Sequence, residues 1–243
     1  MLKPMAHGLQ AQGSYTWSKC IDEGSEASRG DQFLNGIISP LFIEKVHRRG
    51  RCSYDLRHVF VGNMLWSIPG PKEGVASKLL GNWQMGSIVS ASSGVPFSVI
   101  IGPFGQDPLG LGGTDVNGWP DYVAGCKIEN PGDPLHYINT ACFTVPNPIT
   151  RIGTATRNLA TGPHLFNLDM AVYKNIPITS ISEGFRVQFR AEFFNILNHT
   201  NFAPPLSNNA VFNATGAPIG AAGRITSTQT SSRQIQFGLR LNW

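Results

Sequence analysis

Hydrophobic and polar residues alternate strictly over residues 233–243, the last eleven of the chain. A period of two predicts a β-strand with one apolar and one polar face. The length suits a tilted transmembrane strand, which needs roughly 9–11 residues. The apolar positions are Ile235, Phe237, Leu239, Leu241 and Trp243.

Five earlier segments show the same alternation and predict further strands. The pattern is weaker in the second segment because Val59, Val61 and Leu65 fall on its polar side. The third segment keeps its parity through Val99 and contains residues typical of a bend or bulge near position 95. The chain is therefore predicted to be all-β and antiparallel. The six strands are expected near residues 8–18, 54–68, 82–99, 165–174, 185–193 and 233–243.

The connections between these strands alternate between long and short. Residues 69–81 and 175–184 are short links, whereas 19–53, 102–164 and 195–232 are long. This rhythm is typical of an up-and-down transmembrane barrel, which has short periplasmic turns and long outer loops. It predicts that the first, third and fifth strands run outward and that the carboxyl terminus is periplasmic. The long middle loop is rich in Gly, Pro, Asn and Asp, and we expect turns without a core of its own.

Aromatic residues on the apolar faces gather at the two ends of the predicted strands. Membrane barrels carry such girdles because amphipathic rings favour the headgroup level of the bilayer. The periplasmic group comprises Trp66, Trp83, Phe185 and Trp243, and the outer group comprises Tyr15, Trp17, Phe166 and Phe193.

Composition supports a membrane barrel without excluding a secreted β-sandwich. Charged residues make up 14% of the chain, against roughly 25% in soluble proteins. The mean hydropathy is −0.08, and no apolar run approaches the ~18 residues of a membrane helix. The net charge of +4 is weak, and the basic residues of 47–51 lack interleaved aromatics. A nucleic-acid partner is therefore not expected.

The four cysteines are Cys20, Cys52, Cys126 and Cys142. No pair has CxxC spacing and no nearby His completes a zinc set, so a metal site is not expected. In an oxidising compartment we favour the disulfides Cys20–Cys52 and Cys126–Cys142, since each would close within one loop region. The alternative is four unpaired thiols.

The sequence shows no pattern of catalytic residues. It contains no GxSxG elbow, no P-loop and no HExxH motif, so neither an enzyme nor a cofactor is expected. For His58 and His199 we expect structural hydrogen bonding. Ionisable residues on the polar faces would face a barrel lumen, where they could form a charge ladder or, as we favour, cross-strand pairs that fix register. They are Asp169, Arg186, Arg190 and Glu192.

Several segments resemble a known family. GLQAQGSYTWSKC, YDLRHVFVGNMLWSIP, GNWQMGSIVSASSGVPFSV, FRAEFFNILNHTNFAPP and the terminal IQFGLRLNW are similar to the carboxyl-terminal barrel of Oar-like TonB-dependent transporters, which usually carry a carboxypeptidase-regulatory-like domain. The resemblance implies a Gram-negative outer-membrane barrel of about 22 strands around a plug. It also implies uptake of a bulky nutrient through the TonB complex. Phe237, Leu239, Leu241 and Trp243 would form the terminal signal that the barrel-assembly machinery reads.

The resemblance covers only the last part of such a transporter. LKPMAHGLQ has no apolar stretch typical of a signal peptide, and no plug or TonB box is recognisable. We therefore expect residues 1–243 to be one carboxyl-terminal barrel portion, with outer-membrane lipid on one face and the missing plug and strands as partners. Two other classes remain open: a barrel for adhesion or surface organisation, and a secreted soluble β-sandwich that binds a ligand. The sequence does not identify a transported substrate.

Overall fold

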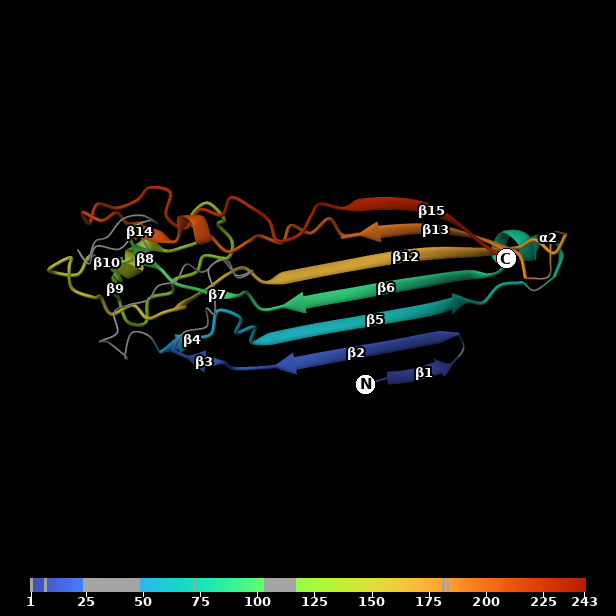
Figure 1. Ribbon diagram of the computed structural model, residues 1–243, viewed down its shortest axis with the longest axis horizontal. Helices are drawn as coiled ribbons and strands as arrows, with labels where there is room; N and C mark the ends of the chain where they lie inside the picture. The colour runs from blue at the N-terminus through green and yellow to red at the C-terminus, as the bar shows by residue number, and fades with distance from the viewer. Residues whose placement is uncertain are drawn as a thin grey trace.

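A single antiparallel sheet of seven strands carries most of the regular structure (Figure 1). The computed structural model describes residues 2–6, 8–23, 49–71, 73–102, 117–180, 182 and 184–243. Each strand of the sheet lies beside the sheet strand next to it along the chain, as in an up-and-down meander. The strands are β1 (Leu2–Ala6), β2 (Leu9–Trp17), β5 (His58–Ile68), β6 (Trp83–Ser92), β12 (Leu165–Pro177), β13 (Arg186–Phe194) and β15 (Gln234–Asn242).

The all-β antiparallel fold and the six predicted strands are confirmed. β1 is an additional strand at the edge of the sheet, where it pairs with β2 through Leu2 and Gln12. Its sequence, LKPMA, is only five residues long. It contains a Pro, which sheets accept mainly at an edge. A segment this short shows too little alternation to predict a strand.

The register sorts the side chains of the sheet onto two faces. One continuous row on the apolar face runs from Leu9 through Trp66, Met85, Val172 and Ala191 to Phe237. On the opposite, polar face, Gln12 lies in a row with Asn63 and Asp169. We call these the apolar face and the polar face.

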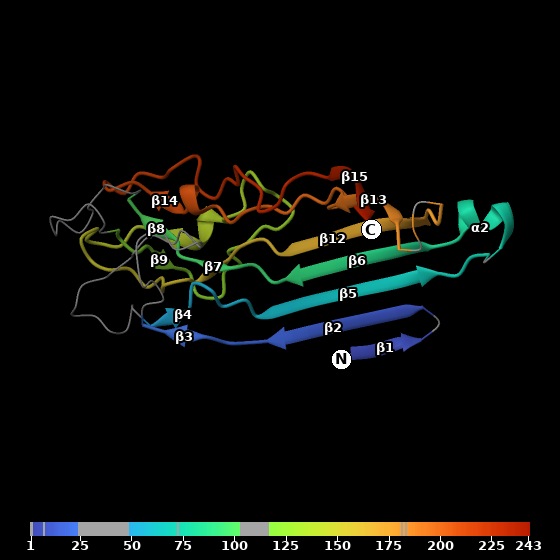
Figure 2. The same ribbon diagram turned by 45° about the vertical axis from the view of Figure 1, so that its right-hand side comes forward.

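Large apolar side chains on the apolar face of β15 are exposed. Phe237 and Leu239 are 66% and 73% exposed. Figures 1 and 2 show the described strands as a single layer, with no second sheet packed on them. A β-sandwich buries this kind of face against another sheet. The described part of the chain therefore lacks the layer that a soluble sandwich needs.

The short and long connections lie at opposite ends of the sheet (Figure 1). We call these the short-connection end, which also holds the carboxyl terminus, and the loop end. The link between β5 and β6 contains a helix that the sequence did not predict, α2 (Gly74–Leu80). No helix among the described residues is long and apolar enough to cross a membrane.

The long connections build a domain with its own core, so the expectation of a coreless middle loop was wrong. We call the described residues of 18–57, 93–164 and 195–233 the loop domain. Trp119 and Val99 are fully buried there and pack with Val211 from another connection. Most of the buried members of this core come from the middle connection, and Val211 and Ala222 come from the last one, so apolar residues scattered among Gly and Pro meet only through tertiary packing. The buried members are Phe97, Val99, Trp119, Ile128, Tyr137, Ile138, Cys142, Phe143, Ala155, Ala160, Val211 and Ala222.

Short elements frame this core. The pairs are β3 (Ile21–Asp22) with β4 (Gly50–Arg51), β7 (Pro96–Phe97) with β11 (Ala160–Thr161), β8 (Ile100–Ile101) with β14 (Ala210–Phe212), and β9 (Asp121–Tyr122) with β10 (Phe143–Thr144). Two 3₁₀-helices, η1 (Thr140–Cys142) and η2 (Leu206–Asn208), complete the described elements.

The third predicted strand is shorter than its alternation suggested. β6 ends at Ser92, and the apolar residues that continue its parity, Phe97 and Val99, are buried in the loop domain. Gly94 marks the departure from the sheet. A Cβ atom at Gly94 would overlap the carbonyl oxygen of Gly162. Close approach of two backbones therefore requires glycine at this position.

Candidate functional site: the polar sheet face and the loop domain

The polar face of the sheet encloses a hollow of about 500 Å³. Its lining comes from five strands and mixes polar with apolar side chains, and two carboxylates are among the polar ones. Gln12, Asn63, Asp169, Tyr173 and Glu192 contribute to it. A surface of this kind can hydrogen-bond water, a polar solute or another polar protein segment.

The four ionisable residues singled out from the sequence share the polar face. Asp169 accepts hydrogen bonds from Asn167 Nδ2 at 2.9 Å and from the backbone N–H of Asn195 at 2.8 Å. The carboxylate therefore fastens the end of β13 to β12. Arg186 and Glu192 lie on the same face, and their register partners on β12 are Pro177 and Ala171, respectively.

Arg190 makes a cross-strand contact with an aromatic ring. Its guanidinium carbon lies 5.6 Å from the ring centroid of Tyr173, its register partner on β12. Its Nε donates to Gln188 Oε1 at 2.8 Å. Among the described residues, none of the four forms an ion pair with another.

Two disulfides brace the loop end. Cys20–Cys52 links the chain after β2 to the chain before β5, with Cα atoms 5.4 Å apart. Cys126–Cys142 closes a segment inside the loop domain, with Cα atoms 5.5 Å apart. This is the pairing favoured in the sequence analysis.

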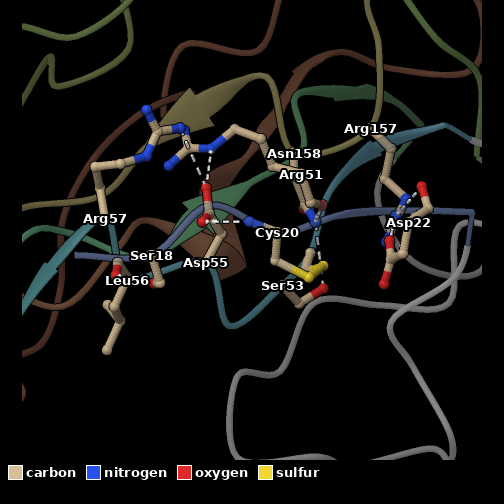
Figure 3. The surroundings of a disulfide bond; sticks show 11 residues. Ser18, Cys20, Asp22, Arg51, Ser53, Asp55, Leu56, Arg57, Arg157 and Asn158 are labelled. Carbon is tan, nitrogen blue, oxygen red and sulfur yellow. Dashed lines mark hydrogen bonds and ion pairs between the residues drawn. A yellow bond between two sulfur atoms is a disulfide. The ribbon is translucent and has the colours of Figure 1, made fainter. Parts of the chain in front are cut away.

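A buried carboxylate supports the first disulfide (Figure 3). Asp55 is 1% exposed and accepts hydrogen bonds from the Cys20 backbone N–H and from Arg51 Nε, each at 3.0 Å. Arg57 Nη2 lies 3.5 Å away. Burial acts to raise the pKa of Asp55, but the two hydrogen bonds and the two cations outweigh burial and hold it below its usual value.

The same region joins the first connection to the middle one. Asn158 Nδ2 donates to the backbone carbonyl of Arg51 at 2.7 Å, although the two residues are 107 positions apart. Arg157 forms an ion pair with Asp22. Burial lowers the pKa of the Arg157 guanidinium. Sequence reasoning missed these residues because neither spacing nor periodicity relates them.

One group in the described part of the chain has the residue types of a metal site. Cys20, Asp22 and Cys52 lie close together. Both sulfurs are consumed in the disulfide, and Asp22 is paired with Arg157. Since cysteine binds a metal as a thiolate, the two disulfide-bonded sulfurs of this group do not suit a metal site.

The two histidines chosen from the sequence both have hydrogen-bond partners at the loop end. His58 Nδ1 lies 2.7 Å from the hydroxyl of Tyr15, and His199 Nδ1 lies 3.1 Å from Asn201 Oδ1. No catalytic partner arrangement is evident around either ring in the described residues. In the basic run, positions 47 and 48 lie outside the described residues.

The register also places the aromatic residues of the apolar face. Tyr15 lies in one row with Phe60 and Phe166 at the loop end. Trp83 lies in a row near the short-connection end. Phe193 pairs with Met170, so it lies further from the loop end than Phe166.

The comparisons with known proteins agree with this geometry. A family model described as an outer membrane beta barrel domain matches residues 1–236. No curated protein and no solved structure matches the chain.

Proposed function

We propose, starting from the fact that this chain belongs to the outer membrane β-barrel domain family, that it forms part of the wall of a TonB-dependent receptor. The receptor would import a bulky nutrient and would perform no catalysis. The observation that carries the proposal is the sheet itself. It exposes an apolar face, borders a hollow with polar and charged side chains on the other face, and bears a disulfide-braced domain at one end.

The distribution of charge supports contact between the apolar face and lipid. A Lys or Arg facing lipid near the bilayer midplane costs roughly 2–4 kcal/mol. On the apolar faces of β2, β5, β6, β12, β13 and β15, the one formally charged residue is Lys174. It lies near the short-connection end of β12, where a long side chain can reach the interface.

The edges of the sheet support additional strands as partners. Backbone N–H and C=O groups that face lipid must be hydrogen-bonded within the protein. The outer edges of β1 and β15 lie at the ends of the strand order. In the proposed receptor, other strands of the same protein pair with both edges, and the polar face surrounds a plug that the TonB complex engages.

The difference in length between the connections at the two ends of the sheet supports one orientation of the sheet across the membrane. Outer-membrane barrels have short periplasmic turns and long outer loops. We therefore assign α2 and the carboxyl terminus to the periplasm and the loop domain to the outside, where it would select the nutrient. Phe237, Leu239, Leu241 and Trp243 would be read by the barrel-assembly machinery before insertion.

Uptake by cells tests the transport proposal. The gene that encodes the whole protein would be deleted and restored, and cells would be offered a labelled ferric siderophore, cobalamin, an oligosaccharide pool and a peptide pool. We expect accumulation of one probe that requires the gene and is abolished by a protonophore. Loss of surface attachment without any gene-dependent accumulation would contradict import and favour the adhesion barrel instead.

A further inference from the structure

The helix at the short-connection end presents apolar side chains that nothing in the described protein covers. Val75, Leu79 and Leu80 of α2 are 75%, 68% and 64% exposed. Val75 and Leu79 are separated by four positions and so lie on one side of the helix. Ser77 is partly buried and lines a hollow with Gln84 of the polar face. Ser77 is therefore on the side of the helix toward the sheet, and Val75 and Leu79 are on the opposite side.

The last turn of α2 is tied to the apolar face of the sheet. Trp83 Nε1 donates a hydrogen bond to the carbonyl oxygen of Leu79 at 2.9 Å. Lys174 Nζ donates to the same oxygen at 3.1 Å and also to the carbonyl of Gly81. Trp83 and Lys174 are register partners on neighbouring strands. These bonds occupy carbonyls that a helix terminus otherwise leaves free.

The contacts explain how a lysine is accommodated on the apolar face. Lys174 is 6% exposed, and its ammonium lies 5.2 Å from the ring centroid of Trp83. The carboxyl end of a helix carries partial negative charge, so it stabilises a nearby cation. The ammonium is thus paired with the helix terminus, and α2 is fixed at the level of this lysine.

We propose that α2 is an interfacial anchor that lies in the phospholipid leaflet at the short-connection end. Val75, Leu79 and Leu80 insert at the boundary between headgroups and acyl chains. The lipid-exposed surface of the barrel continues directly into this helix side, because Trp83 and Lys174 of the apolar face hold its last turn. An amphipathic helix with this arrangement suits a bilayer interface. The proposal rests on the barrel family and not on nutrient import.

The position of Leu79 relative to lipid tests the anchor. The whole receptor with Leu79→Cys would carry an NBD label, in vesicles of phosphatidylcholine and phosphatidylglycerol. Lys78→Cys is the matched control, since it is the neighbouring exposed residue of the same helix. The four native cysteines of residues 1–243 would not react, because all of them are in disulfides, and any cysteine elsewhere in the receptor would be replaced by serine.

We expect lipids with a nitroxide at acyl carbon 5 to quench the label at position 79 at least about threefold more than the label at 78. Equal access of aqueous iodide to both labels, without lipid quenching, would overturn the proposal. A label at 79 shielded from both quenchers would overturn it too, since α2 would then contact protein.

A second variant tests the tether. Trp83→Phe keeps an aromatic ring at this position but removes the N–H donor, so quenching at position 79 should fall about twofold or more. Heat-modifiable electrophoretic mobility would verify that each variant is folded, and Val75→Cys would replace Leu79→Cys if the latter failed to fold. Unchanged quenching in Trp83→Phe would contradict the tether. Anchor loss with intact uptake would leave the transport proposal standing.

Discussion

At the scale of single residues, Asp55 connects the Cys20–Cys52 disulfide to the chain segments on either side of it. The carboxylate is buried, and it receives hydrogen bonds from Cys20 N and Arg51 Nε with Arg57 nearby. Arg57 Nε is itself buried without a hydrogen-bond partner. Loss of the carboxylate charge would therefore leave cationic groups at this junction without compensation, which is costly in a water-poor site.

Asp55→Asn should loosen the junction by about 1–3 kcal/mol. We expect amides of residues 49–57 to exchange with deuterium about 5- to 150-fold faster in the variant at pH 7, as measured by mass spectrometry. Asn keeps the shape of the side chain, so the difference reports the charge. Ser182→Ala, in the link at the opposite end of the sheet, is the matched control and should not change this rate.

The same variant gives a test against pH. The pKa of Asp55 in the folded protein lies below its usual value of 3.8. Its stabilisation is therefore fully present above about pH 4 and is lost as the pH falls through the folded pKa. The ratio of exchange rates between variant and parent should be constant from about pH 5 to 8 and shrink below about pH 4. A ratio that stays the same at about pH 3 would contradict a role for the charge.

At the scale of elements, alternation accounts for most of what the sequence predicts. A period of two is a local property, so β13 and β15 follow from it to within one residue at each end, and β12 begins as predicted but runs three residues further, to Pro177. β1 and α2 do not. Five residues cannot display a period, and the three large apolar residues of α2 are explained by a bilayer and not by a protein core. The end of β6 was missed because Phe97 keeps the strand parity while serving the core of the loop domain.

Two neighbouring positions of β12 test the assignment of the faces. Val172 pairs with Met85 on the apolar face, whereas Ala171 pairs with Gly86 and borders the polar hollow. Val172→Arg should lower the free energy of unfolding of the protein in vesicles by roughly 2–4 kcal/mol. Ala171→Arg should change it much less, since water reaches that side.

Denaturant titration followed by tryptophan fluorescence would give both values. Equal destabilisation by the two arginines would mean that both faces are shielded from water or that both are exposed to it. Either result would contradict the assignment of one face to lipid.

At the scale of the whole molecule, the sheet was predictable and the loop domain was not. The core around Trp119 and Val211 and the bond from Asn158 to Arg51 join segments far apart in the chain. No local pattern marks such partners, because loops lack the periodicity that orders side chains in strands. The four polar-face charges were placed on their shared face by parity alone. Their actual partners, such as Tyr173 for Arg190, required the register between strands.

The central claim is that the apolar face meets lipid while the polar face borders the hydrated interior of the barrel around its plug. Nitroxide labels placed singly from 166 to 173 on β12, in the whole protein in vesicles, would test it most directly. Oxygen, which concentrates in lipid, should relax the labels at even positions, and a water-soluble nickel chelate should relax those at odd positions. The account predicts two opposite oscillations with a period of two. Two results would contradict it. Labels at even positions could be shielded from both reagents, as they would be under a second sheet, or they could be relaxed by the nickel chelate, as in a sheet exposed to water.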